Sequence, residues 1–161
     1  DEERKKNQNA FTHEEVDIIV ATVAFGMGID KSNVRFVVHA AMPKSLEHYQ
    51  QESGRAGRDG LEAECSLFFS SADYLTWKRI LEDSEPQMLE TGALKLGQMY
   101  RYCTGASCRH RTLLQYFNQN LEKDNCGACD ICLAEVEGVP GEQLVRRAGC
   151  RPRTGHAYLL G

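Results

Sequence analysis

Two arginines three residues apart are the first side chains in this chain whose type and spacing could do chemistry. Arg55 and Arg58 lie within Gln-Glu-Ser-Gly-Arg-Ala-Gly-Arg-Asp-Gly, residues 51–60. That spacing places both on one face of a helical turn, and arginine is suited to bidentate phosphate contact. The small residues around them allow backbone to approach a ligand or another domain closely. Standing alone, such a pair more often marks a solvated helix end.

The cysteines are the second such group, and three of the seven crowd into a short turn: Cys126, Cys129 and Cys132. A fourth ligand would complete a closed, tetrahedral zinc site, which is structural rather than catalytic. Cys108 and Cys103 compete for that place because the helical pitch puts both near one face, and His110 is the non-cysteine competitor. An odd number of cysteines favours a metal site in a reducing compartment over a disulfide framework.

The elements that position the arginines read as an α/β sheet. Residues 16–23 are a nearly continuous β-branched run, typical of a strand buried on both faces of a parallel sheet. Residues 34–39 and 64–69 predict two further strands. Ser45 is a plausible N-cap for a helix over residues 46–56. Strand, loop, strand, helix and strand in this order predict an α/β sheet with helices on its faces.

Ligands of such sheets bind at the carboxyl ends of the strands. The loop of residues 24–30 follows one predicted strand end, and the turn from Arg55 to Asp59 is expected to reach the same edge. The pattern therefore predicts that the glycine-containing loop and the arginine pair lie near one rim.

Beyond the third predicted strand the pattern becomes helical. An amphipathic helix is predicted from residue 71, with further helices over residues 87–102 and 107–117. The cysteine turn follows them, so we expect a domain boundary between residues 70 and 85. The predicted division of the chain has three parts: residues 1–75, 76–138 and 139–161.

Composition narrows the classes of protein. Of 161 residues, 42% are hydrophobic and 26% are charged, which is typical of a soluble globular protein. The net charge of −4 provides no overall basic field, so nucleic-acid binding would rest on a local stripe. No apolar run has the length of a membrane span, and the start has no signal-peptide pattern. Because the first residue is Asp1, we expect the chain to begin inside a larger protein. The expected location is intracellular, cytoplasmic in a bacterium or nuclear in a eukaryote.

Three segments resemble one protein family. Residues 51–60 resemble motif VI of superfamily 2 helicases, and their sequence is most similar to the RecQ form of that motif. Residues 19–31 resemble motif V. The four-cysteine set resembles the RecQ zinc-binding domain. The resemblance covers residues 17–132 in the order of the family. It implies part of a RecA-like helicase lobe with a parallel sheet, the second of two, followed by a small helical zinc-binding domain; residues 139–161 would be a tail or the start of a winged-helix domain.

The resemblance implies a nucleotide site shared with the first lobe of the parent chain, where ATP binds with Mg²⁺. Arg58 would be the arginine finger that meets the γ-phosphate, and Arg55 would support it or bridge to the first lobe. Gln51 would position that interface. Asp30 would approach the ribose of ATP, and Gly28 would allow the close turn. No Gly-x-x-x-x-Gly-Lys-Ser/Thr phosphate loop occurs in this sequence.

The family pattern also implies DNA contacts. Thr22 and Lys44 would lie near the DNA backbone, and Arg109 and Arg111 would present charge to phosphates. The plain alternatives are a β-branched strand residue at Thr22 and solvated helix arginines. Because the zinc ligand of the family directly precedes basic residues, the resemblance favours Cys108 over Cys103 and His110.

The function implied is that of part of an ATP-dependent DNA helicase, which couples ATP hydrolysis to 3′-to-5′ unwinding of duplex DNA in recombination and repair. The expected partners are single-stranded DNA, duplex junctions and the first lobe, but no membrane. The alternative is a non-catalytic, zinc-stabilised nucleic-acid-binding module derived from a helicase lobe. An RNA helicase of the same superfamily is a further alternative, against which the cysteine set argues.

Overall fold

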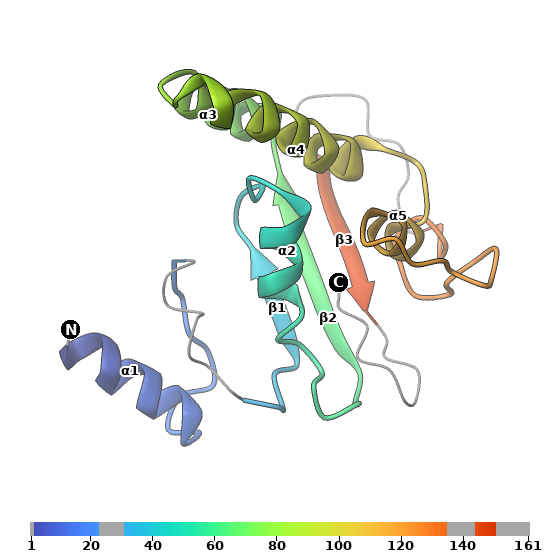
Figure 1. Ribbon diagram of the computed structural model, residues 1–161. Helices are drawn as coiled ribbons and strands as arrows, with labels where there is room; N and C mark the ends of the chain where they lie inside the picture. The colour runs from blue at the N-terminus through green and yellow to red at the C-terminus, as the bar shows by residue number, and fades with distance from the viewer. Residues whose placement is uncertain (1, 23–30, 135–143, 151–161) are drawn as a thin grey trace.

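A three-stranded sheet and five helices make up the part of the chain that the computed structural model describes, residues 2–22, 31–134 and, for the backbone alone, 144–150 (Figure 1). In chain order the elements are α1 (Glu2–Thr12), β1 (Phe36–His39), α2 (Leu46–Ser53), β2 (Ala63–Phe69), α3 (Ser71–Glu82), α4 (Pro86–Thr104), α5 (Arg109–Tyr116) and β3 (Leu144–Cys150). Figure 1 shows α3 and α4 side by side beyond the carboxyl end of β2, and α1 apart from the sheet.

The sheet has the order β1-β2-β3. β1 and β2 are parallel, with Phe36 opposite Glu64, which confirms the predicted α/β class and two of the predicted strands. β3 joins the other side of β2 in antiparallel direction, with Leu144 opposite Phe69. Residues of the predicted tail therefore extend this sheet. Alternate residues of β2 are buried beneath the helices, as the two-residue period of a strand requires.

The predicted strand over residues 16–23 is wrong as far as the structure describes it. Residues 16–22 have no regular structure, and Val16, Ile18 and Val20 are 42%, 64% and 95% exposed. A strand needs a neighbour that pairs with its backbone groups, and within the described ranges β1 has a strand on one side only. The apolar run therefore has the composition of a buried strand, but within the described residues it has no neighbouring strand with which to pair.

The first helix after β1 begins where the sequence predicts. Ser45 is its N-cap, with an extended backbone and a side-chain oxygen that accepts a hydrogen bond from the backbone N–H of His48 at 3.4 Å. The helix ends at Ser53, three residues earlier than predicted. The predicted helices from residue 71, over 87–102 and over 107–117 are confirmed as α3, α4 and α5. Among the described residues, no helix is both long and apolar enough to cross a bilayer.

One hydrophobic core runs across the predicted domain boundary. Its ten buried side chains come from the sheet, the loop before α2, and the helices α2, α4 and α5: Met42, Leu46, Tyr49, Leu67, Phe69, Leu96, Met99, Tyr102, Cys103 and Leu113. A polar contact also crosses the boundary, since the indole N–H of Trp77 donates to the carbonyl of Met42 at 2.8 Å. The Met42 N–H in turn donates to the Asp73 carboxylate at the start of α3, at 3.2 Å. The residues before and after the boundary therefore pack as one unit.

Glu47 ties the start of α2 to two later helices. Its carboxylate lies 2.6 Å from the Lys95 ammonium of α4. Partial burial acts to raise the pKa of Glu47, but hydrogen bonds from Lys95, Ser45 and Tyr116 outweigh it and lower that pKa to about 2. The ionised carboxylate is therefore part of the contact between α2, α4 and α5.

Glu47→Gln is expected to lower the free energy of unfolding at pH 7 by up to about 1 kcal/mol, since the pair is partly solvated. The folded pKa lies below the unfolded value of 4.5, so this stabilisation is complete above the unfolded pKa and is lost as the pH falls toward 2. Urea unfolding of both proteins at several pH values measures the difference. A difference that stayed constant down to pH 2 would contradict the assignment.

Candidate metal centre and arginine turn

Four cysteine sulfurs form a compact group. Cys108 is the residue before α5, and the other three lie on the turn that follows this helix. The four Sγ atoms all lie within 4.8 Å of one another. Asn125 closes the turn, because its side chain accepts from the Gly127 N–H at 2.6 Å and donates to the Cys132 carbonyl at 3.3 Å. The structure thus brings together the four residues that the sequence analysis favoured.

Cys103 and His110, the two competitors for the fourth ligand position, are not part of the four-sulfur group. Cys103 is 2% exposed and belongs to the hydrophobic core. His110 lies against the sulfur group, with Nδ1 3.2 Å from the Sγ of Cys126, a hydrogen-bonding distance for sulfur. The group of potential metal ligands found in the described residues consists of the four cysteines and does not include His110.

The thiols interact strongly. The hydrogen bond from Cys126 lowers the pKa of the Cys129 thiol, and the same bond raises the pKa of Cys126. Thiolates this close repel one another, so the group cannot ionise fully without a cation among the sulfurs. Four thiolates around one ion are the ligand set of structural zinc. The donor set therefore fits Zn²⁺.

A buried ion pair supports the cysteine turn. Arg109 is 3% exposed, and its guanidinium donates to both carboxylate oxygens of Asp130 at 2.9 Å. Its remaining donors reach the carbonyls of Tyr102 and Gly105. The prediction that Arg109 presents charge to DNA is therefore wrong, because the side chain is buried and bound to Asp130 and to these two carbonyls. Sequence reasoning missed Asp130, whose signal is an acidic residue inside the cysteine turn with an arginine directly after Cys108.

Arg111 remains at the surface of the same region. Its Nη2 donates to the carbonyls of Lys123 and Asp124, both at 2.9 Å, so it ties α5 to the loop before the cysteine turn. Its side chain is 36% exposed. The predicted DNA contact of Arg111 stays a prediction.

The two arginines lie on the turn that follows α2, residues 54–60. Gly57 has a φ of 64°, in the left-handed region that favours glycine, and its N–H donates to the Val34 carbonyl at 2.9 Å. Arg58 is exposed, and its Nε donates to the Gly54 carbonyl at 3.3 Å. Arg55 is half-buried; burial and the neighbouring charge of Arg58 lower its pKa. The turn therefore holds two guanidinium groups close together, one of them in contact with water.

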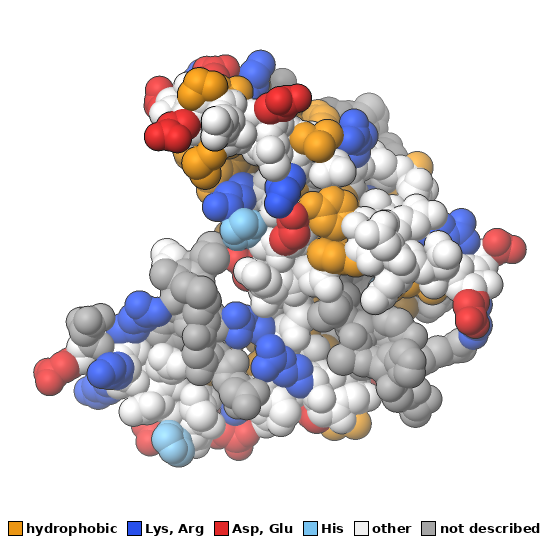
Figure 2. Space-filling model, viewed as in Figure 1, with side chains coloured by type: hydrophobic (Ala, Val, Ile, Leu, Met, Phe, Trp, Pro, Cys, Tyr) orange, Lys and Arg blue, Asp and Glu red, His pale blue; other side chains and the backbone are white. Residues whose placement is uncertain are grey.

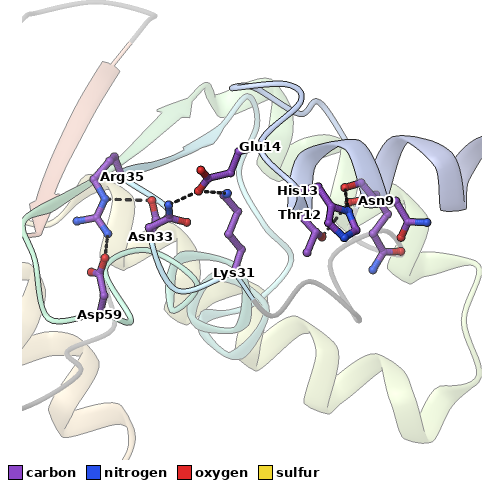
Figure 3. Close-up of polar contacts among 9 residues, drawn as sticks. Asn9, Thr12, His13, Glu14, Lys31, Asn33, Arg35 and Asp59 are labelled. Carbon is purple, nitrogen blue, oxygen red and sulfur yellow. Dashed lines mark hydrogen bonds and ion pairs between the residues drawn. The ribbon is translucent and has the colours of Figure 1, made fainter.

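The segment before β1, residues 31–35, makes polar contacts with this turn and with the residues after α1 (Figure 3). Arg35 donates to the Asn33 carbonyl at 3.1 Å and pairs with the Asp59 carboxylate at 2.5 Å. Glu14 accepts from Asn33 at 2.7 Å and from Lys31 at 3.1 Å, which connects the end of α1 to the same segment. A continuous set of polar contacts therefore runs from α1 to the arginine turn.

The predicted position of the arginines at the carboxyl rim of the sheet is wrong. The Asp59 N–H donates to the Ser32 carbonyl at 3.2 Å, so the turn lies at the amino end of β1. The reason is direction: α2 returns antiparallel to β1, and its last residues reach the segment where that strand begins (Figure 1). Gly28, Asp30 and the rest of the predicted loop lie outside the described residues, but the residues that follow them in the sequence contact the turn.

The remaining predicted site residues are all at the surface. Thr22, Lys44 and Gln51 are exposed. Lys44 precedes the N-cap of α2, and Gln51 lies on that helix near the arginine turn. Lys and Arg side chains are interspersed with Asp and Glu on the face in Figure 2, in keeping with the net charge of −4. The structure gives each of these side chains access to a ligand without bringing them into contact.

Two family models match the chain. Residues 1–60 match the helicase conserved C-terminal domain, and residues 71–133 match the RecQ zinc-binding domain. The ATP-dependent DNA helicase RecQ of Bacillus subtilis is 49% identical over 133 residues, 82% of this chain and 22% of the relative. That of Pasteurella multocida is also 49% identical, over 81% of this chain and 21% of the relative. The ATP-dependent DNA helicase hus2/rqh1 of Schizosaccharomyces pombe is 44% identical, over 83% of this chain and 10% of the relative.

The chain therefore spans about a fifth of the length of the two bacterial relatives. The first matched region holds α1, β1, α2 and the arginine turn, and the second holds α3, α4, α5 and the cysteine group. Both regions in this order, with 49% identity across most of the chain, show that the chain belongs to the RecQ family, of which it holds part of the helicase C-terminal domain and the zinc-binding region.

Proposed function

We propose that this chain is part of an ATP-dependent DNA helicase that couples ATP hydrolysis to 3′-to-5′ unwinding of duplex DNA. The observation that carries the proposal is the pair of guanidinium groups on the arginine turn, in one folded unit with a four-cysteine group. The relatives are named ATP-dependent DNA helicases. The direction of unwinding and the role in recombination and repair rest on family resemblance.

The arginine turn would act on a nucleotide held by another lobe of the parent protein. Arg58 is exposed on the turn, where its Nε donates to the Gly54 carbonyl, and its position at the surface gives a phosphate access to the guanidinium. Its role is to stabilise charge that develops on the γ-phosphate. Arg55, which is half-buried and neighbours Arg58, would fix the turn or bridge the lobes, and Gln51 would contact the same partner. Gly28 and Asp30 are proposed to approach the nucleotide.

The cysteine group would hold one structural Zn²⁺ through Cys108, Cys126, Cys129 and Cys132. Four protein ligands complete the coordination of zinc and leave no position for a substrate. The ion would neutralise the crowded thiolates and fix the cysteine turn against the start of α5. Its role is to hold this turn in place rather than to take part in ATP hydrolysis.

DNA would contact exposed donors outside the buried ion pair. Thr22, Lys44 and Arg111 are the proposed contacts, because each is accessible and suited to a phosphate oxygen. Arg109 is not among them. These contacts would add affinity without reading sequence, since phosphates are the same at every base pair.

The chain by itself is expected to show no measurable ATPase or unwinding activity, whereas the full-length parent shows both. An arginine finger requires phosphates held by another lobe, and the sequence has no phosphate loop to hold them. Hydrolysis of ATP with and without single-stranded DNA, measured for the chain and the parent at equal concentration, tests this. A parent that binds DNA but never hydrolyses ATP would support the non-catalytic module instead.

A further inference from the structure

Five buried side chains form a continuous row from the sheet to the cysteine turn. We call this the buried row, and its members are His39, Tyr49, Tyr102, Arg109 and Asp130. Their exposed fractions are 7%, 0%, 3%, 3% and 1%, in that order. They come from β1, α2, α4, α5 and the cysteine turn, so each step of the row joins two elements of the chain.

Each step is a direct contact. The rings of His39 and Tyr49 have centroids 5.0 Å apart, and those of Tyr49 and Tyr102 are 5.4 Å apart. The guanidinium carbon of Arg109 lies 5.5 Å from the centroid of the Tyr102 ring. Arg109 then binds both carboxylate oxygens of Asp130 at 2.9 Å. Asp130 directly follows Cys129, which places one end of the row at the cysteine group.

The other end of the row reaches the arginine turn. Ser53 donates through Oγ to the Tyr49 carbonyl at 2.7 Å, and His39 Nε2 lies 2.7 Å from the Glu52 carboxylate. The turn begins on these two residues, because the Arg55 N–H donates to the Glu52 carbonyl at 3.2 Å and the Ala56 N–H to the Ser53 carbonyl at 3.0 Å. Two backbone hydrogen bonds of the turn are therefore accepted by residues that contact members of the row.

We propose that the buried row couples zinc binding at the cysteine group to the backbone of the arginine turn, with Tyr49 and Tyr102 as positioning residues. The proposal rests on the zinc site described above and is independent of ATP hydrolysis. In this proposal zinc stabilises the arginine turn as well as the cysteine turn that binds it.

The physical reason is the cost of an unpaired buried charge. When the ion leaves, the cysteine turn relaxes and Asp130 no longer stays in register with Arg109. An arginine left buried without its partner is strongly destabilising, so its side chain moves toward water and leaves the face of the Tyr102 ring. Close-packed interiors change between discrete arrangements rather than deforming smoothly. The change therefore passes to Tyr49 and to the last turn of α2.

Coupling between two sites is reciprocal, so the first test works from the far end of the row. Tyr49→Leu removes a ring of the row without touching the cysteines. In the 161-residue chain, this variant is expected to raise the dissociation constant of zinc by about tenfold, within the roughly 5- to 150-fold range of coupled sites. Competition with a chromogenic chelator measures the constant. Tyr49→Phe keeps the ring and is expected to bind zinc like the unaltered chain.

Leu67→Ala is the matched control, since Leu67 is 3% exposed and lies in the same core but outside the row. It is expected to destabilise the chain while changing the zinc dissociation constant by less than about twofold, below that coupling range. Equal losses of zinc affinity in Tyr49→Leu and Leu67→Ala would overturn the proposal and assign the effect to general stability.

Hydrogen exchange of the unaltered chain provides a test that does not depend on a variant that folds. Metal analysis first establishes that the purified chain carries zinc; if it carries none, the zinc site itself fails. After chelation, amides of residues 54–57 are expected to exchange about tenfold faster, whereas those of β1 and β2 keep their protection. Faster exchange confined to residues 108–132, or an equal loss of protection in β2, would overturn the coupling through the row.

Discussion

Arg58→Ala in the full-length parent is expected to lower DNA-stimulated ATP turnover by roughly 10³- to 10⁵-fold, the contribution of an arginine finger to phosphoryl transfer. The guanidinium is exposed on a turn whose backbone is fixed by hydrogen bonds to the segment before β1. Because the charge that it meets develops mainly in the transition state, the affinity for nucleotide is expected to change little. Steady-state hydrolysis and nucleotide binding, measured side by side, separate the two effects.

The matched control is Arg79→Ala, an exposed arginine in the last turn of α3. Its turnover is expected to equal that of the unaltered parent. Arg55→Ala is also expected to reduce turnover, with a larger effect on how the lobes work together, since Arg55 is half-buried and close enough to Arg58 to feel its charge. Normal turnover in Arg58→Ala would remove Arg58 from the mechanism and make it a surface arginine.

Cys108→Ser is expected to release the metal and to unfold α5 and the cysteine turn at room temperature. Structural zinc binding contributes about 10–16 kcal/mol in small zinc domains at pH 7, as much as the whole stability of an ordinary domain. Metal analysis of the purified variant and its thermal unfolding measure both effects. Retention of one zinc per chain in this variant would show that Cys108 is not a ligand.

Cys103→Ser is the matched control, because both cysteines are buried and lie close in sequence. It is expected to keep its zinc and to lose about 1–3 kcal/mol of stability, since it buries a hydroxyl in the hydrophobic core. Loss of metal from Cys103→Ser with retention in Cys108→Ser would reverse the choice of ligand. The pair therefore tests the site directly.

The metal centre could be predicted because its chemistry depends on residue type and short spacing. Three cysteines within one turn have few uses other than binding a metal. The helices could be predicted in the same way, since Ser45 and the apolar periods of α4 and α5 are local signals. The pairing of Asp130 with Arg109 is harder to predict, because 21 residues separate them and their only link in the sequence is that each directly follows a cysteine of the metal group. The family resemblance implied a DNA contact for Arg109, in keeping with the usual position of charged side chains at the surface.

The strand over residues 16–23 shows a second limit of sequence reasoning. A run of β-branched residues is suited to a buried strand, but it forms one only when another part of the chain pairs with it in a sheet. The position of the arginine turn likewise depends on α2 running antiparallel to β1, and the residue pattern of the helix does not specify this direction. Both errors concern long-range partners, whereas nearly every local signal led to the element that it indicated.

The core that α4 shares with the sheet has a consequence for synthesis on the ribosome. Tyr49 and its neighbours on α2 emerge first, while Tyr102 and the rest of α4 are added about 50 residues later, which takes about 3–10 s at 5–20 residues per second. During that interval the side chains of the nascent α2 lack the part of their cover that α4 provides, although those of β2 have already been made. The core is therefore completed only after synthesis of α4, and until then the incomplete chain exposes apolar surface to which chaperones can bind.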